Sequence, residues 1–133
     1  MKTISIRKTG TAIALLAVVG APLALADSAS AKGGGTAVQS TGAYTGGGTF
    51  KLKAKHDSGR IQVEYEVDTN KVGQVWTVTL TDNGVVVYQG ANKTVAPSGS
   101  FTVSRLIADR AGTDTIRAHA VRGTASCGGA VSL

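Results

Sequence analysis

The stretch FKLKAKHDSGRIQVEYEVD, residues 50–68, decides the fold, because apolar and charged side chains alternate along it in two successive runs. In the first run the apolar residues Phe50, Leu52 and Ala54 alternate with three lysines. In the second run, apolar residues at odd positions from 61 to 67 alternate with amide or acidic residues. A period of two predicts two strands that each bury one face. The turn formers Asp57, Ser58 and Gly59 between them predict a hairpin.

The hairpin buries both apolar sets on one face only if the numbers of paired residues add up to an odd value, such as 117. This register sets Lys51 opposite Glu66, Lys53 opposite Glu64 and Lys55 opposite Gln62. A shift of one residue would turn one charged row into the core. Because the lysines are balanced by acids across the hairpin, we interpret the charged stripe as specifying the fold rather than as a partner surface.

The same period continues through the rest of the chain. Trp76, Val78 and Leu80 alternate with threonines, and Asn83-Gly84 after them is a strong hairpin signal. Further strands are expected near residues 85–89, 101–106, 116–121 and 125–133, with Tyr65 and Trp76 in the core. No stretch has a helical period. The sequence therefore predicts an all-β fold over residues 49–133, an antiparallel immunoglobulin-like β-sandwich of about seven strands. A small barrel such as the OB-fold is the alternative.

The N-terminus predicts export. Residues 1–26 combine a basic, acid-free start, an apolar run and a small-residue end, as in a secretory signal peptide. Cleavage is expected after Ala26, with Ala31 as the second option. A membrane anchor is the competing interpretation, but Gly20 and Pro22 interrupt the apolar run. We therefore expect a secreted, extracellular protein with no membrane span after cleavage.

Residues 27–48 are rich in Gly, Ser and Thr and are predicted to be a flexible leader, with at most one weak strand near residues 43–45. Three of the 14 Lys and Arg residues lie in the signal peptide, so against eight acids the chain from Asp27 onward has a formal net charge of +3. This charge is too low for the dense basic stripe that nucleic acids require, and we expect no nucleic-acid partner.

Catalytic and metal signatures are missing from the sequence. His56 and His119 are the only histidines, and each is expected to be exposed. A calcium-loop pattern that begins at Asp68 breaks down, which leaves a weak loop site among Asp68, Asp82, Asp109 and Asp114 as an alternative. No nucleophile elbow or zinc-protease motif occurs. We therefore expect no cofactor and no enzymatic activity.

Cys127 is the only cysteine, so an intrachain disulfide is impossible. Its position predicts an inward, buried side chain, with a free reactive thiol as the alternative. The candidate surface contacts are Tyr88, Arg105, Arg110, Arg117 and Arg122. The arginines would form a mild basic patch for an anionic cell-envelope polymer or a secreted protein, unless they are only a solvated face.

The segments GRIQVEYEVDTNKVGQVWTVTL (59–80) and PSGSFTVSRLIADRAGTDTIRAHA (97–120) resemble small secreted actinobacterial proteins of unknown function with a bacterial immunoglobulin-like domain. In those proteins two cysteines suggest a bridge between the chain ends. Here Tyr44 stands at the first cysteine position and Cys127 at the second. The resemblance thus implies a lost bridge, an unpaired Cys127 and an N-terminal segment that frays more easily.

The function expected from these features is that of a secreted, non-enzymatic binding or structural module with an unidentified ligand. One alternative is a secreted protease inhibitor that presents the stretch GANKTVAPSGS, residues 90–100, as an extended loop. Another alternative is an enzyme whose site has no recognisable signature.

Overall fold

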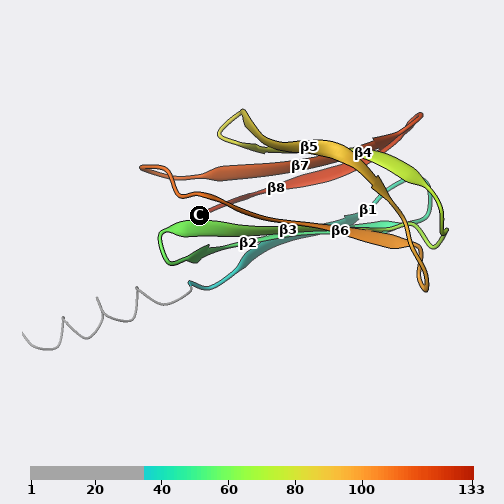
Figure 1. Cartoon of the computed structure of the whole chain (residues 1–133), viewed down its shortest axis with the longest axis horizontal. Helices are drawn as coiled ribbons and strands as arrows, with labels where there is room; N and C mark the ends of the chain where they lie inside the picture. Colours follow the sequence, from blue (N-terminus) through green and yellow to red (C-terminus); the bar gives the residue numbers. More distant parts are fainter. Residues whose placement is uncertain (1–34) are drawn as a thin grey trace, which may run out of the picture. The chain divides into compact units, whose positions relative to one another are not determined.

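In the computed structural model, eight antiparallel strands form two four-stranded sheets within residues 35–133, which are the residues that the structure describes (Figure 1). The strands are β1 (Val38–Ala43), β2 (Thr49–Asp57), β3 (Arg60–Asp68), β4 (Val75–Asp82), β5 (Val85–Lys93), β6 (Ser100–Ala108), β7 (Thr115–Arg122) and β8 (Ala125–Ser132). Sheet A has the order β1-β2-β3-β6, and sheet B has the order β5-β4-β7-β8. The predicted all-β antiparallel sandwich is confirmed. Within residues 35–133 no helix is long and apolar enough to cross a membrane.

The β2–β3 hairpin has the predicted register. Lys51 pairs with Glu66, Lys53 with Glu64 and Lys55 with Gln62. Lys53 Nζ lies 3.6 Å from Glu64 Oε1. The turn places Ser58 and Gly59 at positive φ, 51° and 82°, as a two-residue hairpin turn requires. The alternating charges therefore form cross-strand pairs on the outer face, and the apolar residues of both strands face the core.

The Asn83-Gly84 hairpin is also confirmed. It joins β4 to β5, and both turn residues have positive φ, 49° and 86°. A β-bulge between Leu80 and Thr81 sets Tyr88 opposite Leu80 and Val86 opposite Thr81. Tyr88 therefore turns toward the interior while Val86 stays outside.

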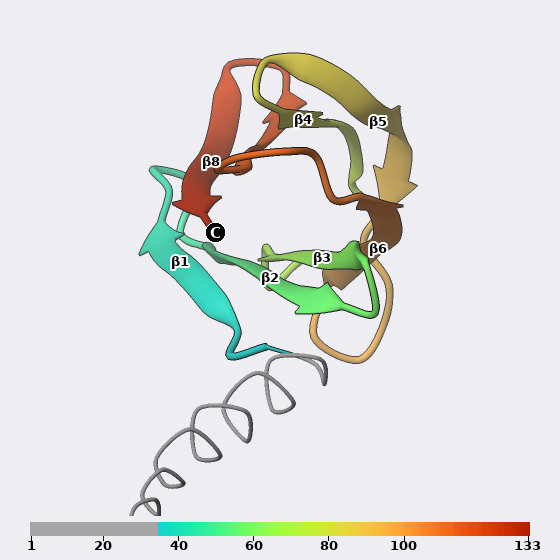
Figure 2. The same cartoon turned by 90° about the vertical axis from the view of Figure 1, so that its left-hand side faces the viewer.

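Counted from β2, the strand order follows the immunoglobulin-like arrangement, in which strands A, B and E lie in one sheet and strands C, F and G in the other. Strands β2, β3 and β6 belong to sheet A, strands β4, β7 and β8 belong to sheet B, and β1 is an additional edge strand. Here β2 and β3 form a hairpin inside sheet A, and the chain crosses to sheet B only at β4. Figure 2 shows the two sheets facing each other, with β1 beside β8 and β5 beside β6 at the two open sides. The core between the sheets includes Trp76 and Tyr65, which are both almost completely buried.

The eighth strand, β1, corrects the prediction that residues 27–48 are a flexible leader. Val38–Ala43 pairs with β2 over its whole length, so the weak strand expected near residues 43–45 lies earlier in the chain and ends at Ala43. The composition was misleading because an edge strand needs backbone hydrogen bonds more than large side chains. Small residues are required here, since a Cβ at Gly42 would meet the Phe50 ring at 2.8 Å.

The second triple-glycine run, residues 46–48, is a turn rather than part of a flexible linker. The backbone N–H of Tyr44 donates to the carbonyl of Gly48, and that of Gly47 donates to Tyr44, both at 3.1 Å. The Tyr44 ring lies over this turn, where side chains at Gly46 and Gly48 would collide with it. The same ring packs edge-on against Trp76 at a centroid distance of 5.4 Å. These contacts tie the N-terminal part of the sandwich to its core.

The predicted signal peptide, residues 1–26, both cleavage positions and residues 27–34 of the predicted leader lie outside the described residues.

Candidate binding face

The two outer faces of the sandwich carry different charge. On sheet A the register aligns Lys53 with Glu64 and Lys51 with Glu66, so each outward lysine of these rows has an acid beside it. The remaining members of the rows, on β1 and β6, are the uncharged residues Gln39, Thr41, Thr102 and Ser104. Lys55, opposite Gln62, has no acid in its own row, but the outward charges of the β2–β3 hairpin balance, with Lys51, Lys53, Lys55 and Arg60 against Asp57, Glu64, Glu66 and Asp68.

The outer face of sheet B carries cations without acids. Its rows, read from the register, are Lys93-Val75, Ala91-Thr77-Val121-Ser126, Gln89-Thr79-His119-Gly128 and Val86-Thr81-Arg117-Ala130. We call these residues the sheet B face. Lys93, Arg117 and His119 are exposed on it, and none of its members is acidic. The sequence showed this alternation within each strand, but only the strand order reveals that β5 and β7 both flank β4.

A hollow of about 730 Å³ lies at the β7–β8 end of the sheet B face, next to the β1–β2 connection. Its lining includes Arg117 and His119, and it contains no carboxylate; hydroxyl groups come from Thr45, Thr124 and Ser126. Gly128 in the lining allows β8 to approach β7 closely, because a Cβ there would collide with the carbonyl oxygen of Ala118 on the neighbouring strand. The hollow thus offers positive charge, hydroxyl groups and exposed backbone to a ligand.

Cys127 lies on the inner side of the same hollow and is buried, as predicted. The Tyr65 hydroxyl donates a hydrogen bond to the Cys127 carbonyl at 3.0 Å and lies 3.4 Å from Sγ. Burial raises the pKa of the Cys127 thiol, although the hydrogen bond from Tyr65 opposes this effect. Burial and the same hydrogen bond raise the pKa of Tyr65. Both groups therefore stay protonated, and the thiol is a poor nucleophile at neutral pH.

Tyr44 also lines the hollow, so the structure brings together the two positions that the resemblance pairs as cysteines. Burial, and secondarily the neighbouring Cys127, raises the pKa of Tyr44.

Arg105 and Tyr88, two of the predicted surface contacts, bind each other. The Arg105 guanidinium carbon lies 4.2 Å from the centroid of the Tyr88 ring, and the Asn92 side-chain amide donates to the Tyr88 hydroxyl at 3.0 Å. Tyr88 is half-buried rather than an exposed ring, because the bulge at Val87 in β5 sets Tyr88 opposite the inward-facing Leu80. The pair joins β5 to β6 across one open side of the sandwich and so has a structural role.

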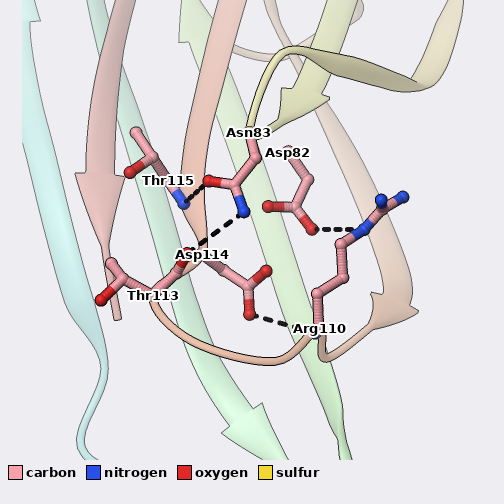
Figure 3. Close-up of polar contacts among 6 residues, drawn as sticks. All are labelled: Asp82, Asn83, Arg110, Thr113, Asp114 and Thr115. Atoms are coloured by element: carbon pink, nitrogen blue, oxygen red, sulfur yellow. Dashed lines mark hydrogen bonds and ion pairs between the residues drawn. The ribbon is translucent and has the colours of Figure 1, made fainter.

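Arg110 lies in the β6–β7 connection, where it contacts the buried residues Asp82 and Asp114 (Figure 3). Its Nε lies 3.3 Å from Oδ2 of the fully buried Asp82, and its backbone N–H donates to Oδ2 of Asp114 at 3.3 Å. Burial, and secondarily the charge of Asp82, raises the pKa of Asp114. Asn83 fixes the corner by accepting a hydrogen bond from the Thr115 N–H at 2.9 Å.

The predicted arginine patch is therefore divided among separate places. Arg105 is at the β5–β6 side, Arg110 is in the corner, and Arg122 ends β7; Arg117 alone of the four is on the sheet B face. Sequence reasoning missed Lys93 and His119 as its companions on that face. The alternation along the sequence indicates that both side chains point outward from their strands. It does not indicate that β4 pairs with both β5 and β7.

The aspartates considered for a weak calcium site have other partners. Asp109 Oδ2 lies 3.0 Å from Nδ1 of His56, and Asp68 accepts the backbone N–H of Asn70 at 3.1 Å. Across residues 35–133, no group of three or more His, Cys, Asp or Glu side chains is arranged to hold a metal ion.

The stretch proposed as an inhibitor loop, residues 90–100, is not an extended loop. Residues 90–93 belong to β5, and Val95 pairs with Ser100 to close a short turn. The backbone N–H of Gly99 donates to the Val95 carbonyl at 2.9 Å, which makes the turn compact. Pro97 lies in this turn and is exposed.

The chain matches no known family model, and no curated protein and no solved structure is significantly similar to it.

Proposed function

We propose that the protein is a secreted, non-enzymatic binding module that holds an anionic cell-envelope polymer on the sheet B face. The observation that carries the proposal is the separation of charge between the two outer faces. Lysines on sheet A are offset by acids, whereas Lys93 and Arg117 on sheet B have no carboxylate among the outward residues around them.

A flat sheet surface of this kind suits a repeating chain better than a small molecule. The outward rows consist mainly of threonine and small residues over four strands, with isolated cations at Lys93 on β5 and Arg117 on β7. Hydroxyl groups can hydrogen-bond to sugars or phosphates, and the cations can contact successive negative groups. The hollow over Gly128 would accept a bulkier part of such a polymer.

A non-enzymatic role is supported by the state of the most reactive side chain near the face. The Cys127 thiol is buried and hydrogen-bonded to Tyr65, and its pKa is raised, which disfavours the thiolate that nucleophilic catalysis needs. In our proposal the hollow therefore holds a ligand and does not transform it.

The test is a binding titration with dextran sulfate, with neutral dextran as the negative probe. We expect Arg117→Glu to weaken binding of dextran sulfate about tenfold, because it reverses the charge of the one arginine on the face. Lys51→Glu is the matched control, since it changes net charge equally but lies on the balanced face of sheet A. We expect the control to change affinity by less than about twofold.

Equal losses from Arg117→Glu and Lys51→Glu would show that net charge alone governs binding, and the proposed face would be wrong. Equal binding of neutral dextran would also contradict a charge-based site. The proposed export is tested separately, by measuring the amounts of the protein in cells, cell wall and culture medium. Retention inside the cells, with residues 1–26 still attached, would contradict the proposed export.

A further inference from the structure

The connections β3–β4 (residues 69–74) and β5–β6 (residues 94–99) are locked together by two buried threonines. The Thr94 hydroxyl donates to the Lys71 carbonyl at 2.6 Å and accepts the backbone N–H of Gln74 at 2.8 Å. The Thr69 hydroxyl lies 2.9 Å from the carbonyl oxygens of both Lys71 and Gly99. A side chain at Gly99 would collide with the Lys71 backbone, so the two connections touch directly.

This locked backbone holds three valines in solvent. Val72, Val75 and Val95 are 59%, 53% and 55% exposed, respectively. Their neighbourhood follows from the backbone, because Val75 pairs with Lys93 and the Gly73 N–H donates to the Thr94 carbonyl at 2.8 Å. We call Val72, Val75 and Val95 the valine platform. Several apolar side chains held out by a rigid backbone are typical of an interface, because little further ordering is needed on binding.

The charges beside the valine platform are positive. Lys71 and Lys93 flank it and are exposed. The nearest acid in the sequence, Asp68, already accepts the Asn70 N–H. A second copy of the chain would bring these lysines face to face, which disfavours self-association. The valine platform with its flanking lysines instead complements a partner that has an apolar interior beneath an anionic surface.

We propose that the valine platform docks on a lipid bilayer that contains anionic headgroups. The three valines enter the boundary between headgroups and acyl chains, while Lys71 and Lys93 contact lipid phosphates. The contact is peripheral. The platform shares Val75 and Lys93 with one end of the sheet B face, whereas Arg117 and His119 lie farther along that face, in rows that exclude the platform. A substitution at Arg117 therefore distinguishes polymer binding from lipid binding.

The experiment is co-sedimentation with phosphatidylcholine vesicles, with and without phosphatidylglycerol. It uses the processed protein recovered after export. We expect binding only to the vesicles that contain phosphatidylglycerol. The double variant Val72→Ser, Val95→Ser is expected to bind these vesicles about tenfold more weakly, and Lys71→Glu, Lys93→Glu at least about tenfold more weakly.

The double variant Val85→Ser, Val86→Ser is the matched control. It removes two comparably exposed valines that follow the Asn83-Gly84 turn, at the opposite end of the strands. It should bind the vesicles like the parent protein. Melting temperatures of all variants show whether the fold is intact, and Arg117→Glu should keep vesicle binding while it loses dextran sulfate.

An environment-sensitive fluorophore provides a second measurement. Attached at Val72→Cys it should brighten on vesicle binding, whereas attached at Ala111→Cys, in the β6–β7 connection, it should not. Parent-like binding of the Val72→Ser, Val95→Ser variant would overturn the proposal, and so would an equal loss in the Val85→Ser, Val86→Ser control. A dimer that the platform substitutions abolish would assign the valines to a second copy of the chain instead.

Discussion

Asp82 and Asp114 are both fully buried at one end of sheet B, and Arg110 contacts both of them. Among the described residues, Oδ1 of Asp82 and Oδ1 of Asp114 have no hydrogen-bond partner. Two adjacent buried carboxylates do not both ionise readily, because each charge disfavours the other in a medium of low polarity. A proton on Asp114 removes this repulsion and supplies a donor to Asp82.

The first prediction concerns the pH dependence of stability. Burial and the charge of Asp82 raise the pKa of Asp114 in the folded protein above its ordinary value of 3.8. The protonated form is therefore favoured by folding. The protonated Asp114 carboxyl contributes its full stabilisation when the pH is below the ordinary pKa of 3.8. This stabilisation is lost as the pH rises through the raised pKa of the folded protein. Asp114→Asn, which keeps this position neutral, should become progressively more stable relative to the parent protein as pH increases.

Urea unfolding of both proteins between about pH 4 and about pH 8 measures this difference. Asp57→Asn is the control, because Asp57 lies in the β2–β3 hairpin outside the buried pair. It should leave the pH profile unchanged. Parallel profiles for Asp114→Asn and the parent protein would mean that Asp114 does not bind its proton more tightly in the folded state.

The second prediction concerns the contact between Arg105 on β6 and Tyr88 on β5. The contact between Arg105 and Tyr88 should contribute a coupling free energy of about 0.5–1 kcal/mol, typical of an exposed cation–π pair. A double-mutant cycle of Arg105→Ala and Tyr88→Leu, followed by urea unfolding, measures it. Coupling near zero would show that Arg105 is only solvated. Neither substitution should affect dextran sulfate binding, because the pair lies outside the sheet B face.

The elements that the sequence predicted best are those whose contacts are local. The register of Lys51 with Glu66 follows from the period of two in both strands and from a short turn, so one hairpin contains all the necessary information. The strand β1 was missed because its stability comes from backbone pairing and from the fit of Gly42 against Phe50, which composition does not reveal.

The contacts that escaped sequence reasoning join strands that are distant in the chain. Arg105 meets Tyr88, and Arg110 meets Asp82, only because of the order of the strands in the two sheets. The sheet B face depends in the same way on β7 pairing with β4. Arg117 was identified as a candidate contact from its residue type, but its separation from the other three arginines required the topology.

The third prediction concerns Gly128, which lines the hollow and lets β8 approach β7 closely. Gly128→Ala places a Cβ against the Ala118 carbonyl on the paired strand, so the backbone of β7 or β8 must shift. We expect a loss of about 1–3 kcal/mol in the free energy of unfolding, the usual cost of overpacking. Ser126→Ala, at the next outward position of β8, is the control and should change stability by less than about 0.5 kcal/mol.

If Gly128→Ala and Ser126→Ala unfold at the same urea concentration, the close approach of β8 to the Ala118 carbonyl is not a constraint on the fold. The Gly128→Ala variant also reports on the ligand. Where Gly128→Ala remains folded at low temperature, it should bind dextran sulfate more weakly than the parent protein, because the shift of β7 or β8 that the added methyl group forces alters the lining of the hollow.

The last prediction concerns the pairing of Tyr44 with Cys127. Both residues line the hollow, and the resemblance to small secreted proteins pairs their positions as cysteines. Tyr44→Cys should therefore form an intrachain disulfide with Cys127, seen as a mass lower by two hydrogens under non-reducing conditions. The oxidised variant should be more stable than its own reduced form by about 2–4 kcal/mol, because the bridge closes a long loop of the unfolded chain.

The comparison must be made within the variant, since removing the Tyr44 ring also removes its edge contact with Trp76. Tyr44→Ala measures that separate cost and should resemble reduced Tyr44→Cys in stability. If Tyr44→Cys shows neither a disulfide by mass nor a higher melting temperature than its reduced form, the two positions are not an interrupted bridge. The Tyr44 ring would then be an independent means of anchoring the β1–β2 turn to the core.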